Sequence, residues 1–257
     1  MKLIVANWKC NPPKEKEAIR IFNSLERGLK SAKKVEVVIC PPFVYLLGCK
    51  AQGTRRKVQG ARFKLGAQNC FWEEAGAFTG EISPLMLKDM GVKYVILGHS
   101  ERRGILKETN EMVAKKLKKV LESGILPIFC IGENKDEKGK GKTFEVLEEE
   151  LKQGLKLVPK NQIPKITIAY EPIWAIGTKN PCSVDDTLTV ILFIRKIISR
   201  ILTKKAAKKI RILYGGSVDS NNAKDYLKEE EMNGLLVGGA SLNSKEFLNI
   251  LKIAGNH

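Results

Sequence analysis

The sequence predicts a closed (β/α)8 barrel of the α/β class that spans residues 1–257 as a single domain. Three observations predict this fold: eight short runs rich in Val, Ile and Leu, amphipathic segments between them, and a length of 257 residues. Apolar runs without polar alternation are typical of parallel strands buried on both faces. Eight strand–helix units in about 250 residues fit a closed barrel better than an open doubly wound sheet. No stretch rich in Pro, Gly or Ser is long enough to separate two domains.

The elements follow one another in a regular order along the chain. The predicted strands are residues 3–7, 35–40, 63–68, 94–98, 126–131, 166–170, 210–214 and 234–237. Amphipathic periodicity predicts helices that include residues 14–31, 108–122, 143–157 and 185–203. Residues 135–142, rich in lysine and containing two glycines, are predicted to form an exposed loop. Because strands alternate with helices, the strands are expected to be parallel.

The formal net charge of +17 raises the question of a polyanionic partner. The lysines recur within helical segments, as in residues 115–119 and 204–209, rather than in a basic stripe interleaved with aromatic residues. Solvated helix faces are therefore the favoured interpretation. Neither a nucleic acid nor a membrane is expected as a partner.

The six cysteines indicate a reducing environment. None forms a Cys-x-x-Cys pair or lies at metal-ligand spacing from a histidine, so no metal site is expected. A disulfide framework is typical of smaller, secreted domains. The apolar run at the amino terminus is too short for a signal peptide, and residues 188–202 are too few and too charged to span a bilayer. A cytoplasmic location is expected.

In a barrel of this kind, catalytic residues gather where the strands end at their carboxyl side. The first strand ends in Asn7-Trp8-Lys9, where the lysine is either solvated or part of a site. His99 follows the fourth strand and precedes a predicted helix start, where outward-pointing N–H groups disfavour an imidazolium. A histidine kept neutral there donates a hydrogen bond to a substrate oxygen, whereas a lone histidine elsewhere is more often structural.

Glu171 directly follows the sixth strand and precedes an apolar segment with a glycine. This arrangement indicates a base beneath a lid or, alternatively, a glutamate that caps the next helix. The seventh and eighth strands are followed by Gly215-Gly216-Ser217 and Gly238-Gly239. Paired glycines are ordinary in turns, but in a barrel the loops after these two strands commonly form a phosphate site. The sequence therefore predicts a phosphorylated ligand.

Together these motifs resemble the triosephosphate isomerase family. The resemblance is carried, in order along essentially the whole chain, by Asn-x-Lys, Gly-His-Ser-Glu-Arg-Arg, Tyr-Glu-Pro-Ile-Trp-Ala-Ile-Gly-Thr, Tyr-Gly-Gly-Ser and Val-Gly-Gly-Ala. It implies a TIM barrel and an isomerase of glycolysis and gluconeogenesis. Such an enzyme interconverts dihydroxyacetone phosphate and D-glyceraldehyde 3-phosphate by proton transfer through an enediolate. No cofactor is needed, because neither hydride nor electrons leave the substrate.

The resemblance also implies roles for individual residues. Glu171 is expected to be the base, His99 the electrophile and Lys9 the cation that faces the substrate, while Asn7 helps to hold the substrate. Contacts to the phosphate group are implied for a further set, which consists of Gly177, Ser217, Gly238 and Gly239.

Residues 172–178 are implied to form part of a closing lid, and Glu101 to support the region of Lys9. The sequence departs from the family pattern just after the lid, where it has Lys179-Asn180-Pro181-Cys182. Proline fixes φ and restricts the residue before it. The lid is therefore expected to open more slowly or to have a displaced hinge.

The segment from Gln68 to Glu81 is a long loop that carries Phe71, Trp72 and Phe78. These aromatic side chains are expected to be largely uncovered on a monomer, and long ordered loops with aromatic residues usually meet a partner. In the resembling family this loop inserts into a second subunit, where a threonine matching Thr79 reaches the catalytic residues. A homodimer is therefore expected.

Two other functions must be weighed. Another phosphate-binding barrel isomerase or aldolase would place different residues at these strand ends. A basic barrel that binds polyanions without catalysis is favoured by the net charge, and opposed by the presence of Asn7, Lys9, His99 and Glu171. A coupled isomerase assay distinguishes these functions.

Overall fold

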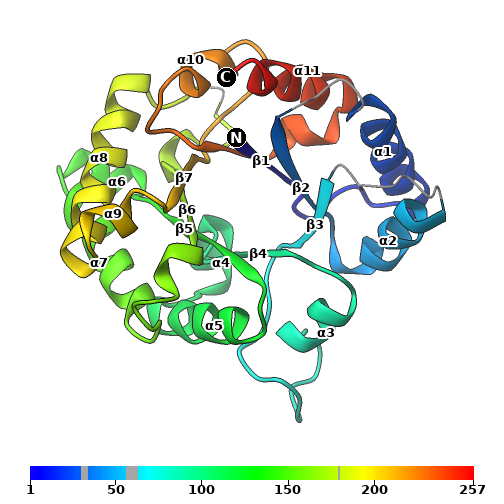
Figure 1. The fold of residues 1–257 in the computed structure, drawn as a ribbon, viewed down its shortest axis with the longest axis horizontal. Coiled ribbons are helices and arrows are strands. Elements are labelled where there is room, and N and C mark those ends of the chain that lie inside the picture. The colour runs from blue at the N-terminus through cyan, green and yellow to red at the C-terminus, as the bar shows by residue number, and fades with distance from the viewer. Residues whose placement is uncertain (30–33, 56–62, 179) are drawn as a thin grey trace.

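A computed structural model describes residues 1–29, 34–55, 63–178 and 180–257 of the chain. Eight parallel strands form a closed barrel in the order β1 to β8, with β8 returning to pair with β1. Helices surround the strands as an outer ring (Figure 1). The predicted (β/α)8 barrel is confirmed.

The strands lie within one residue of their predicted bounds. They are β1 (Lys2–Asn7), β2 (Val35–Cys40), β3 (Phe63–Ala67), β4 (Tyr94–Leu97), β5 (Leu126–Ile131), β6 (Thr167–Tyr170), β7 (Arg211–Tyr214) and β8 (Gly234–Val237). The fourth strand stops one residue early because Gly98 has a φ of 70°, which ends the extended conformation.

The helices lie between the strands as the alternation predicts. The α-helices are α1 (Glu15–Gly28), α2 (Leu46–Arg55), α3 (Pro84–Asp89), α4 (Ser100–Leu106), α5 (Asn110–Glu122), α6 (Lys135–Gly139), α7 (Thr143–Leu155), α8 (Val184–Ile201), α9 (Lys204–Ala207), α10 (Ala223–Leu227) and α11 (Ser244–Gly255). Short 3-10 helices are η2 (Phe43–Tyr45), η3 (Ile163–Lys165), η4 (Ile173–Ala175) and η5 (Gly239–Leu242). The four predicted helices correspond to α1, α5, α7 and α8, although the end predicted at Ser31 lies outside the described residues.

The prediction of a loop over residues 135–142 was wrong for its first half, which forms α6. The side chain of Asn134 accepts the backbone N–H of Glu137 at 3.0 Å, and the Glu137 carboxylate accepts the backbone N–H of Asn134 at 2.8 Å. This reciprocal cap satisfies two N–H groups at the helix start. Local capping therefore outweighs the two glycines, the first of which ends the helix.

Most lysines of the predicted solvated faces are exposed, and Lys115 pairs with Glu111 one turn away at 2.9 Å. Lys116 is an exception to that prediction, because it is only 3% exposed. Its ammonium donates to the Glu108 carboxylate and, at 2.9 Å, to Asn69 Oδ1. A buried charge needs such partners. Asn69 lies 47 residues away in the chain and Glu108 lies just before α5, so the periodicity of the helix alone does not identify them.

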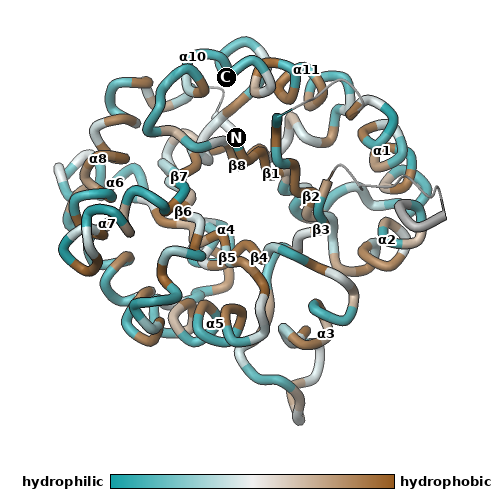
Figure 2. Tube along the Cα trace, viewed as in Figure 1, coloured by the Kyte–Doolittle hydropathy of each residue, from teal (hydrophilic) through white to brown (hydrophobic). Residues whose placement is uncertain are grey.

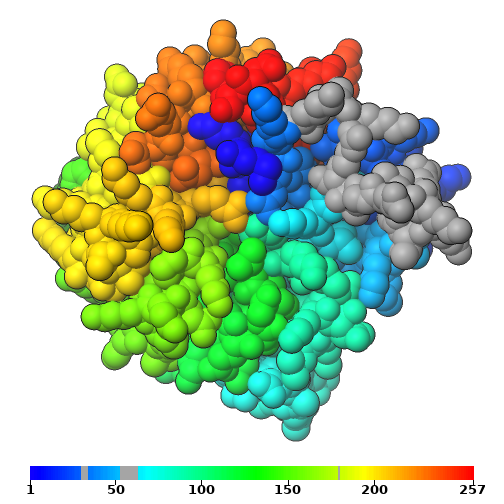
Figure 3. All heavy atoms as spheres, in the orientation of Figure 1, coloured from blue at the N-terminus to red at the C-terminus, as the bar shows by residue number. Residues whose placement is uncertain are grey.

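Two layers of apolar side chains fill the molecule. One cluster consists of strand residues alone, including Leu3, Val5, Ile96 and Leu236, and fills the barrel interior. A larger cluster packs the outer faces of the strands against the helices. Hydrophobic colouring follows the strands and the inward sides of the helices (Figure 2), and atoms close over the centre of the ring (Figure 3). The barrel is therefore a packed core rather than a pore.

A charged cluster around Glu36 lies at the amino-terminal end of the barrel. The Glu36 carboxylate accepts hydrogen bonds from Lys64 Nζ and the Tyr94 hydroxyl, both at 2.6 Å, and from the Arg211 guanidinium at 2.7 Å. The Glu36 side chain is 10% exposed. Burial raises its pKa, but the three hydrogen bonds together lower it further, so the pKa falls from 4.5 to about 2.

We expect Glu36→Gln to lower the free energy of unfolding by about 1–3 kcal/mol at pH 7, because it removes a charged acceptor from three donors. A carboxyl group whose pKa falls on folding stabilises the native state above its unfolded pKa, and this contribution is lost as pH falls toward the folded pKa. The difference between wild type and variant should therefore shrink between about pH 5 and pH 2. Urea unfolding across this range measures it, with the exposed Glu111→Gln as control. A difference that stays constant with pH would contradict the assigned charge.

Candidate active site

The site lies at the carboxyl ends of the strands, opposite the Glu36 cluster. Alternate residues of a strand point to the same face. In β1, β6 and β8, a residue of the interior cluster is followed two positions later by a predicted site residue. These pairs are Val5 and Asn7, Ala169 and Glu171, and Leu236 and Gly238. Strand alternation therefore brings three separate parts of the chain to one opening.

His99 reaches the same opening by a turn of the chain. The left-handed conformation of Gly98 interrupts the alternation of β4, and His99 becomes the N-cap residue of α4. Its Nδ1 accepts the backbone N–H of Glu101 at 3.2 Å. An accepting Nδ1 carries a lone pair, so the ring proton of a neutral imidazole is on Nε2.

Glu171 lies directly against His99. Its Oε1 is 3.1 Å from His99 Nε2, and its Oε2 accepts the backbone N–H of Ser100 at 3.1 Å. The carboxylate thus lies at the start of α4, and not at the start of the helix that follows Glu171 in sequence. Both side chains are buried, with Glu171 2% exposed.

The backbone around Glu171 is fixed by a close approach of β5. The Glu171 N–H donates to the Ile131 carbonyl at 2.8 Å. A Cβ at Gly132 would lie 1.8 Å from the Glu171 carbonyl oxygen, so only glycine is accommodated there. The position of the carboxylate therefore depends on a glycine after a neighbouring strand.

Lys9 has a φ of 54°, a left-handed conformation that is costly for a residue with a side chain. Two hydrogen bonds hold it: the Lys9 N–H donates to Asn7 Oδ1 at 3.1 Å, and Gln68 Nε2 donates to the Lys9 carbonyl at 2.9 Å. Lys9 Nζ pairs with Glu101 Oε1 at 2.6 Å. Glu101 thus touches both Lys9 and, through its backbone, His99.

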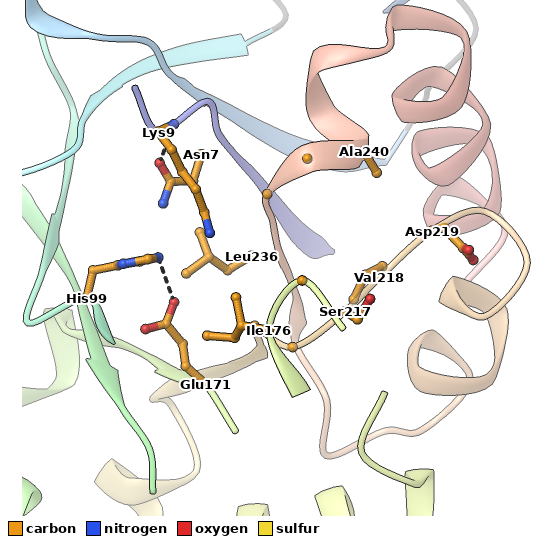
Figure 4. A pocket seen from close by; sticks show the side chains of 15 residues that line it. Asn7, Lys9, His99, Glu171, Ile176, Ser217, Val218, Asp219, Leu236 and Ala240 are labelled. Carbon is orange, nitrogen blue, oxygen red and sulfur yellow. Dashed lines mark hydrogen bonds and ion pairs between the residues drawn. The ribbon is translucent and has the colours of Figure 1, made fainter. Parts of the chain in front are cut away.

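A cavity of about 330 Å³ is lined by every residue that the sequence predicted for the site, namely Asn7, Lys9, His99, Glu171, Gly177, Ser217, Gly238 and Gly239. Figure 4 shows Lys9, His99, Glu171 and Ile176 arranged around this space. Its far side is formed by the glycine-rich loops after β7 and β8, where backbone N–H groups can approach an anion. The cavity therefore combines a carboxylate, an imidazole and an ammonium with a cradle suited to phosphate.

Sequence reasoning missed Leu236 and Asp219, which also line the cavity. Leu236 forms its floor, and strand alternation ahead of Gly238 was a signal for it. The Asp219 carboxylate accepts the backbone N–H groups of Asn221 at 2.9 Å and Asn222 at 3.1 Å. Asp219 therefore shapes the loop after β7.

Glu133, which follows β5, is a further residue that the sequence did not single out. Its side chain accepts hydrogen bonds from Trp174 Nε1 at 2.8 Å and the Tyr170 hydroxyl at 3.2 Å, and its carbonyl accepts the N–H of Ile173 at 3.0 Å. Burial raises the pKa of Glu133, and the Trp174 and Tyr170 hydrogen bonds oppose that rise. Glu133 thus ties the first part of the lid segment, residues 172–178, to β5. Its place just after a strand was the available signal.

The sequence that departs from the family pattern is only partly described, since Lys179 lies outside the described residues. Asn180 is exposed, Pro181 is half-buried and Cys182 is buried. The chain that follows the lid segment therefore passes from solvent to the protein interior within three residues.

The loop from Gln68 to Glu81 projects from the barrel beside α3 (Figure 1). Phe78 is 43% exposed, as expected. The prediction of largely uncovered side chains was wrong for Phe71 and Trp72, which are half-buried. Their rings pack together with centroids 4.1 Å apart, and Phe71 also lies 4.8 Å from the Phe78 ring. The loop buries part of its own aromatic surface.

Three further observations concern sites and compartments. All six cysteines are unpaired. Within the described ranges, no cluster of three or more His, Cys, Asp or Glu side chains is arranged to hold a metal ion. None of the helices that the structure describes is long and apolar enough to cross a membrane.

Comparison with known proteins identifies the family. The family model described as Triosephosphate isomerase matches residues 2–254. Proteins named triosephosphate isomerase from Dictyoglomus turgidum and Aquifex aeolicus are 46% and 47% identical over 253 and 252 residues, which cover 98% and 97% of this chain and 98% of each relative. The Clostridium botulinum protein of that name is 44% identical over 249 residues, 97% of this chain and 98% of its own. Nothing in these comparisons supports a barrel without catalysis. The chain belongs to the triosephosphate isomerase family.

Proposed function

We propose that this chain interconverts dihydroxyacetone phosphate and D-glyceraldehyde 3-phosphate, with Glu171 as the base, His99 as the electrophile and Lys9 as the cation. One observation carries the assignment of roles: Glu171 and His99 meet at 3.1 Å on the wall of a cavity that also contains Lys9 and two glycine-rich loops. The family is the best-known example of a glutamate base paired with a neutral histidine under a closing loop. The roles follow from that precedent and from the geometry.

The reaction moves one proton between adjacent carbons. The Glu171 carboxylate takes a proton from the carbon next to the carbonyl, and the resulting carboxylic acid returns it to the neighbouring carbon. His99 Nε2–H donates to the oxygen on which negative charge develops, which stabilises the enediolate. Because both electrons of the broken C–H bond stay in the substrate, the chemistry requires no redox cofactor.

Substrate binding must rearrange the contact between these two residues. In the structure, the Nε2–H that the mechanism directs at a substrate oxygen faces Glu171 Oε1. A triose phosphate that inserts its oxygen at Nε2 therefore frees Glu171 Oε1 to face the adjacent carbon. One hydrogen bond of His99 Nε2 is thereby replaced by another, so substrate binding itself gives Glu171 and His99 their catalytic arrangement.

The phosphate group is assigned to the far side of the cavity. We place it against the backbone of Ser217, Gly238 and Gly239, with Gly177 of the lid segment above it. Lys9 lies between this side and the catalytic pair, where its charge attracts the dianion and the developing enediolate alike. Asn7, whose side chain holds the Lys9 backbone, lies on the same wall.

A coupled assay tests the proposal directly. Glyceraldehyde 3-phosphate formed from dihydroxyacetone phosphate is oxidised by a dehydrogenase, and the rate of NADH formation reports isomerisation. We expect wild-type activity without added metal or cofactor. Protein that is folded by circular dichroism but inactive in both directions would refute the proposed function.

We further propose a homodimer formed through the loop from Gln68 to Glu81. Beside the catalytic residues lies a second hollow of about 510 Å³, lined in part by Lys9, His99 and Ile105. Exposed apolar side chains surround this region of the fold, including Ile105 at 74% and Val44 at 79%. The projecting loop of a second subunit supplies apolar surface to cover them.

Sedimentation is expected to show a particle of twice the 28.7 kDa chain mass at micromolar concentration. Phe78→Asp should weaken the dimer at least about tenfold, because it places a charge in the proposed contact. Leu192→Asp, at an exposed apolar position on α8, is the matched control and should leave the dimer intact. A wild-type monomer at micromolar concentration would exclude this assembly.

The remaining proposals concern organisation and compartment. We propose that residues 1–257 form one domain, because the described helices all pack around one closed sheet. We also propose a cytoplasmic location, which suits six unpaired thiols and a substrate of central metabolism.

A further inference from the structure

The backbone of Cys182 is held on both sides by tyrosine hydroxyls. Its N–H donates to the Tyr214 hydroxyl at 3.0 Å, and its carbonyl accepts a hydrogen bond from the Tyr226 hydroxyl. The two tyrosine rings stack, with centroids 4.2 Å apart and planes inclined by 15°. Both rings are almost fully buried. Cys182 is therefore clamped where the chain leaves the lid segment and enters α8.

The clamp is built from the same part of the fold as the proposed phosphate site. Tyr214 ends β7, and its hydroxyl passes beneath Gly216, where an added Cβ would lie 2.2 Å from that oxygen. Gly216 and Ser217 line the catalytic cavity. Tyr226 belongs to α10, which follows that same loop. Two phenol groups thus join the chain after the lid segment, the loop after β7 and α10.

The residues just before Cys182 determine which part of the lid region is free to move. Pro181 has a fixed φ and no N–H, so it contributes less freedom to a hinge than another residue would and cannot donate to the clamp. Gly177, with a φ of 72°, and the exposed Asn180 lie on the solvent side of Pro181. We therefore expect the motion of the lid segment to take place mainly before Pro181, against an anchored Cys182.

We infer that Tyr226 is a positioning residue for the lid: by bonding the Cys182 carbonyl and stacking on Tyr214, it anchors the chain just after the lid segment to the loop after β7. This inference rests on the proposed function. Loss of the anchor lowers the fraction of enzyme in the closed, binding-competent state, which raises the apparent KM. It also exposes the bound intermediate to water more often.

An exposed enediolate has a competing fate. The C–O bond to the phosphate group breaks, inorganic phosphate leaves with the bonding electron pair, and the remaining enol tautomerises to methylglyoxal. The two products together contain the atoms of the triose phosphate, and no oxidant or reductant is required. The ratio of phosphate released to triose isomerised therefore reports how well the lid stays closed, which a purely structural role of Tyr226 would not change.

Tyr226→Phe tests the inference, because it keeps the stacked ring and removes only the donor. We expect KM for glyceraldehyde 3-phosphate to rise roughly two- to tenfold, the effect of losing one hydrogen bond. The phosphate released per isomerisation should rise by a similar factor, and hydrogen exchange of the Cys182 amide, followed by NMR, should become faster. Tyr45→Phe is the matched control, since the Tyr45 hydroxyl donates to the Pro12 carbonyl at 3.0 Å beside α2, across the barrel from α8.

The outcomes are distinguishable. A wild-type enzyme without isomerase activity refutes the proposed function. If the wild type is active but Tyr226→Phe has the same KM, the same ratio of phosphate release to isomerisation and the same exchange rate of the Cys182 amide, only the anchor is refuted. If the variant does not fold, hydrogen exchange in the wild-type enzyme provides the test. The anchor requires the Cys182 amide to exchange more slowly than the Asn180 amide. Equal exchange rates would overturn the inference.

Discussion

Replacing Glu171 by glutamine is expected to lower kcat roughly 10³- to 10⁴-fold, because it removes a positioned general base that no neighbouring group replaces. His99 cannot take over, since its Nδ1 accepts the Glu101 N–H and its Nε2 must donate to the substrate. The amide keeps the shape of the side chain and an oxygen for the Ser100 N–H. Folding should therefore be retained while turnover in a coupled assay is lost.

Glu36→Gln provides the matched control for this experiment. It makes the same carboxylate-to-amide change in another largely buried side chain, at the far end of the barrel. We expect it to affect stability and leave kcat unchanged. If Glu171→Gln retained the wild-type kcat, the assignment of the base would be wrong.

Glu171→Asp refines the result. The shorter side chain withdraws the carboxylate by roughly 1 Å, and a misplacement of that size costs on the order of 10²-fold in rate. Because the Glu171 N–H donates to the Ile131 carbonyl at 2.8 Å, a shift of the strand end that compensated for the shorter side chain would have to break this hydrogen bond. An Asp variant that is closer to wild type than tenfold would show that the proton is taken through a water molecule or by another group.

The barrel was predictable because its strands are buried on both faces and carry uninterrupted apolar runs. The end of the fourth strand was predicted one residue too late because Gly98 changes the backbone conformation there. The helix α6 was missed because its stability comes from a reciprocal cap between Asn134 and Glu137 and not from an apolar stripe. Lys116 was misplaced because its partners lie outside the helix, Asn69 at 47 residues' distance in the chain and Glu108 just before α5.

The site was predictable because chemistry in such barrels concentrates at strand ends, and unusual polar residues follow those ends in this sequence. The cavity gathers all of the residues predicted for it. Glu133 also follows a strand end, but its partner Trp174 lies 41 residues away, so the sequence did not single it out. Tyr226 was not predictable, because it lies within the short helix α10 and reaches the Cys182 carbonyl only through the tertiary fold.

Replacing Lys9 by methionine is expected to lower kcat/KM by about 10²- to 10³-fold, the usual cost of removing one preorganised group that stabilises transition-state charge. Among the described residues that line the cavity, Lys9 is the one with a full positive charge. Part of the loss should appear in KM, because the substrate dianion is attracted in the ground state, and part in kcat, because the enediolate carries further charge. Methionine keeps the length of the side chain, so the strained backbone of residue 9 remains held by Asn7 and Gln68.

Two matched variants separate the charge of Lys9 from the effects of its ion pair. Lys64→Met removes the lysine of the other pair with a 2.6 Å contact, Lys64 with Glu36, and should leave the kinetics unchanged. Glu101→Gln keeps Lys9 charged but weakens its 2.6 Å contact, so its loss of kcat/KM should be far smaller than that of Lys9→Met. If Glu101→Gln and Lys9→Met lost activity equally, the contact rather than the cation would be the essential feature. If Lys9 is a cation that faces both substrate and enediolate, Lys9→Met must lose more kcat/KM than Glu101→Gln, and this loss must be divided between KM and kcat.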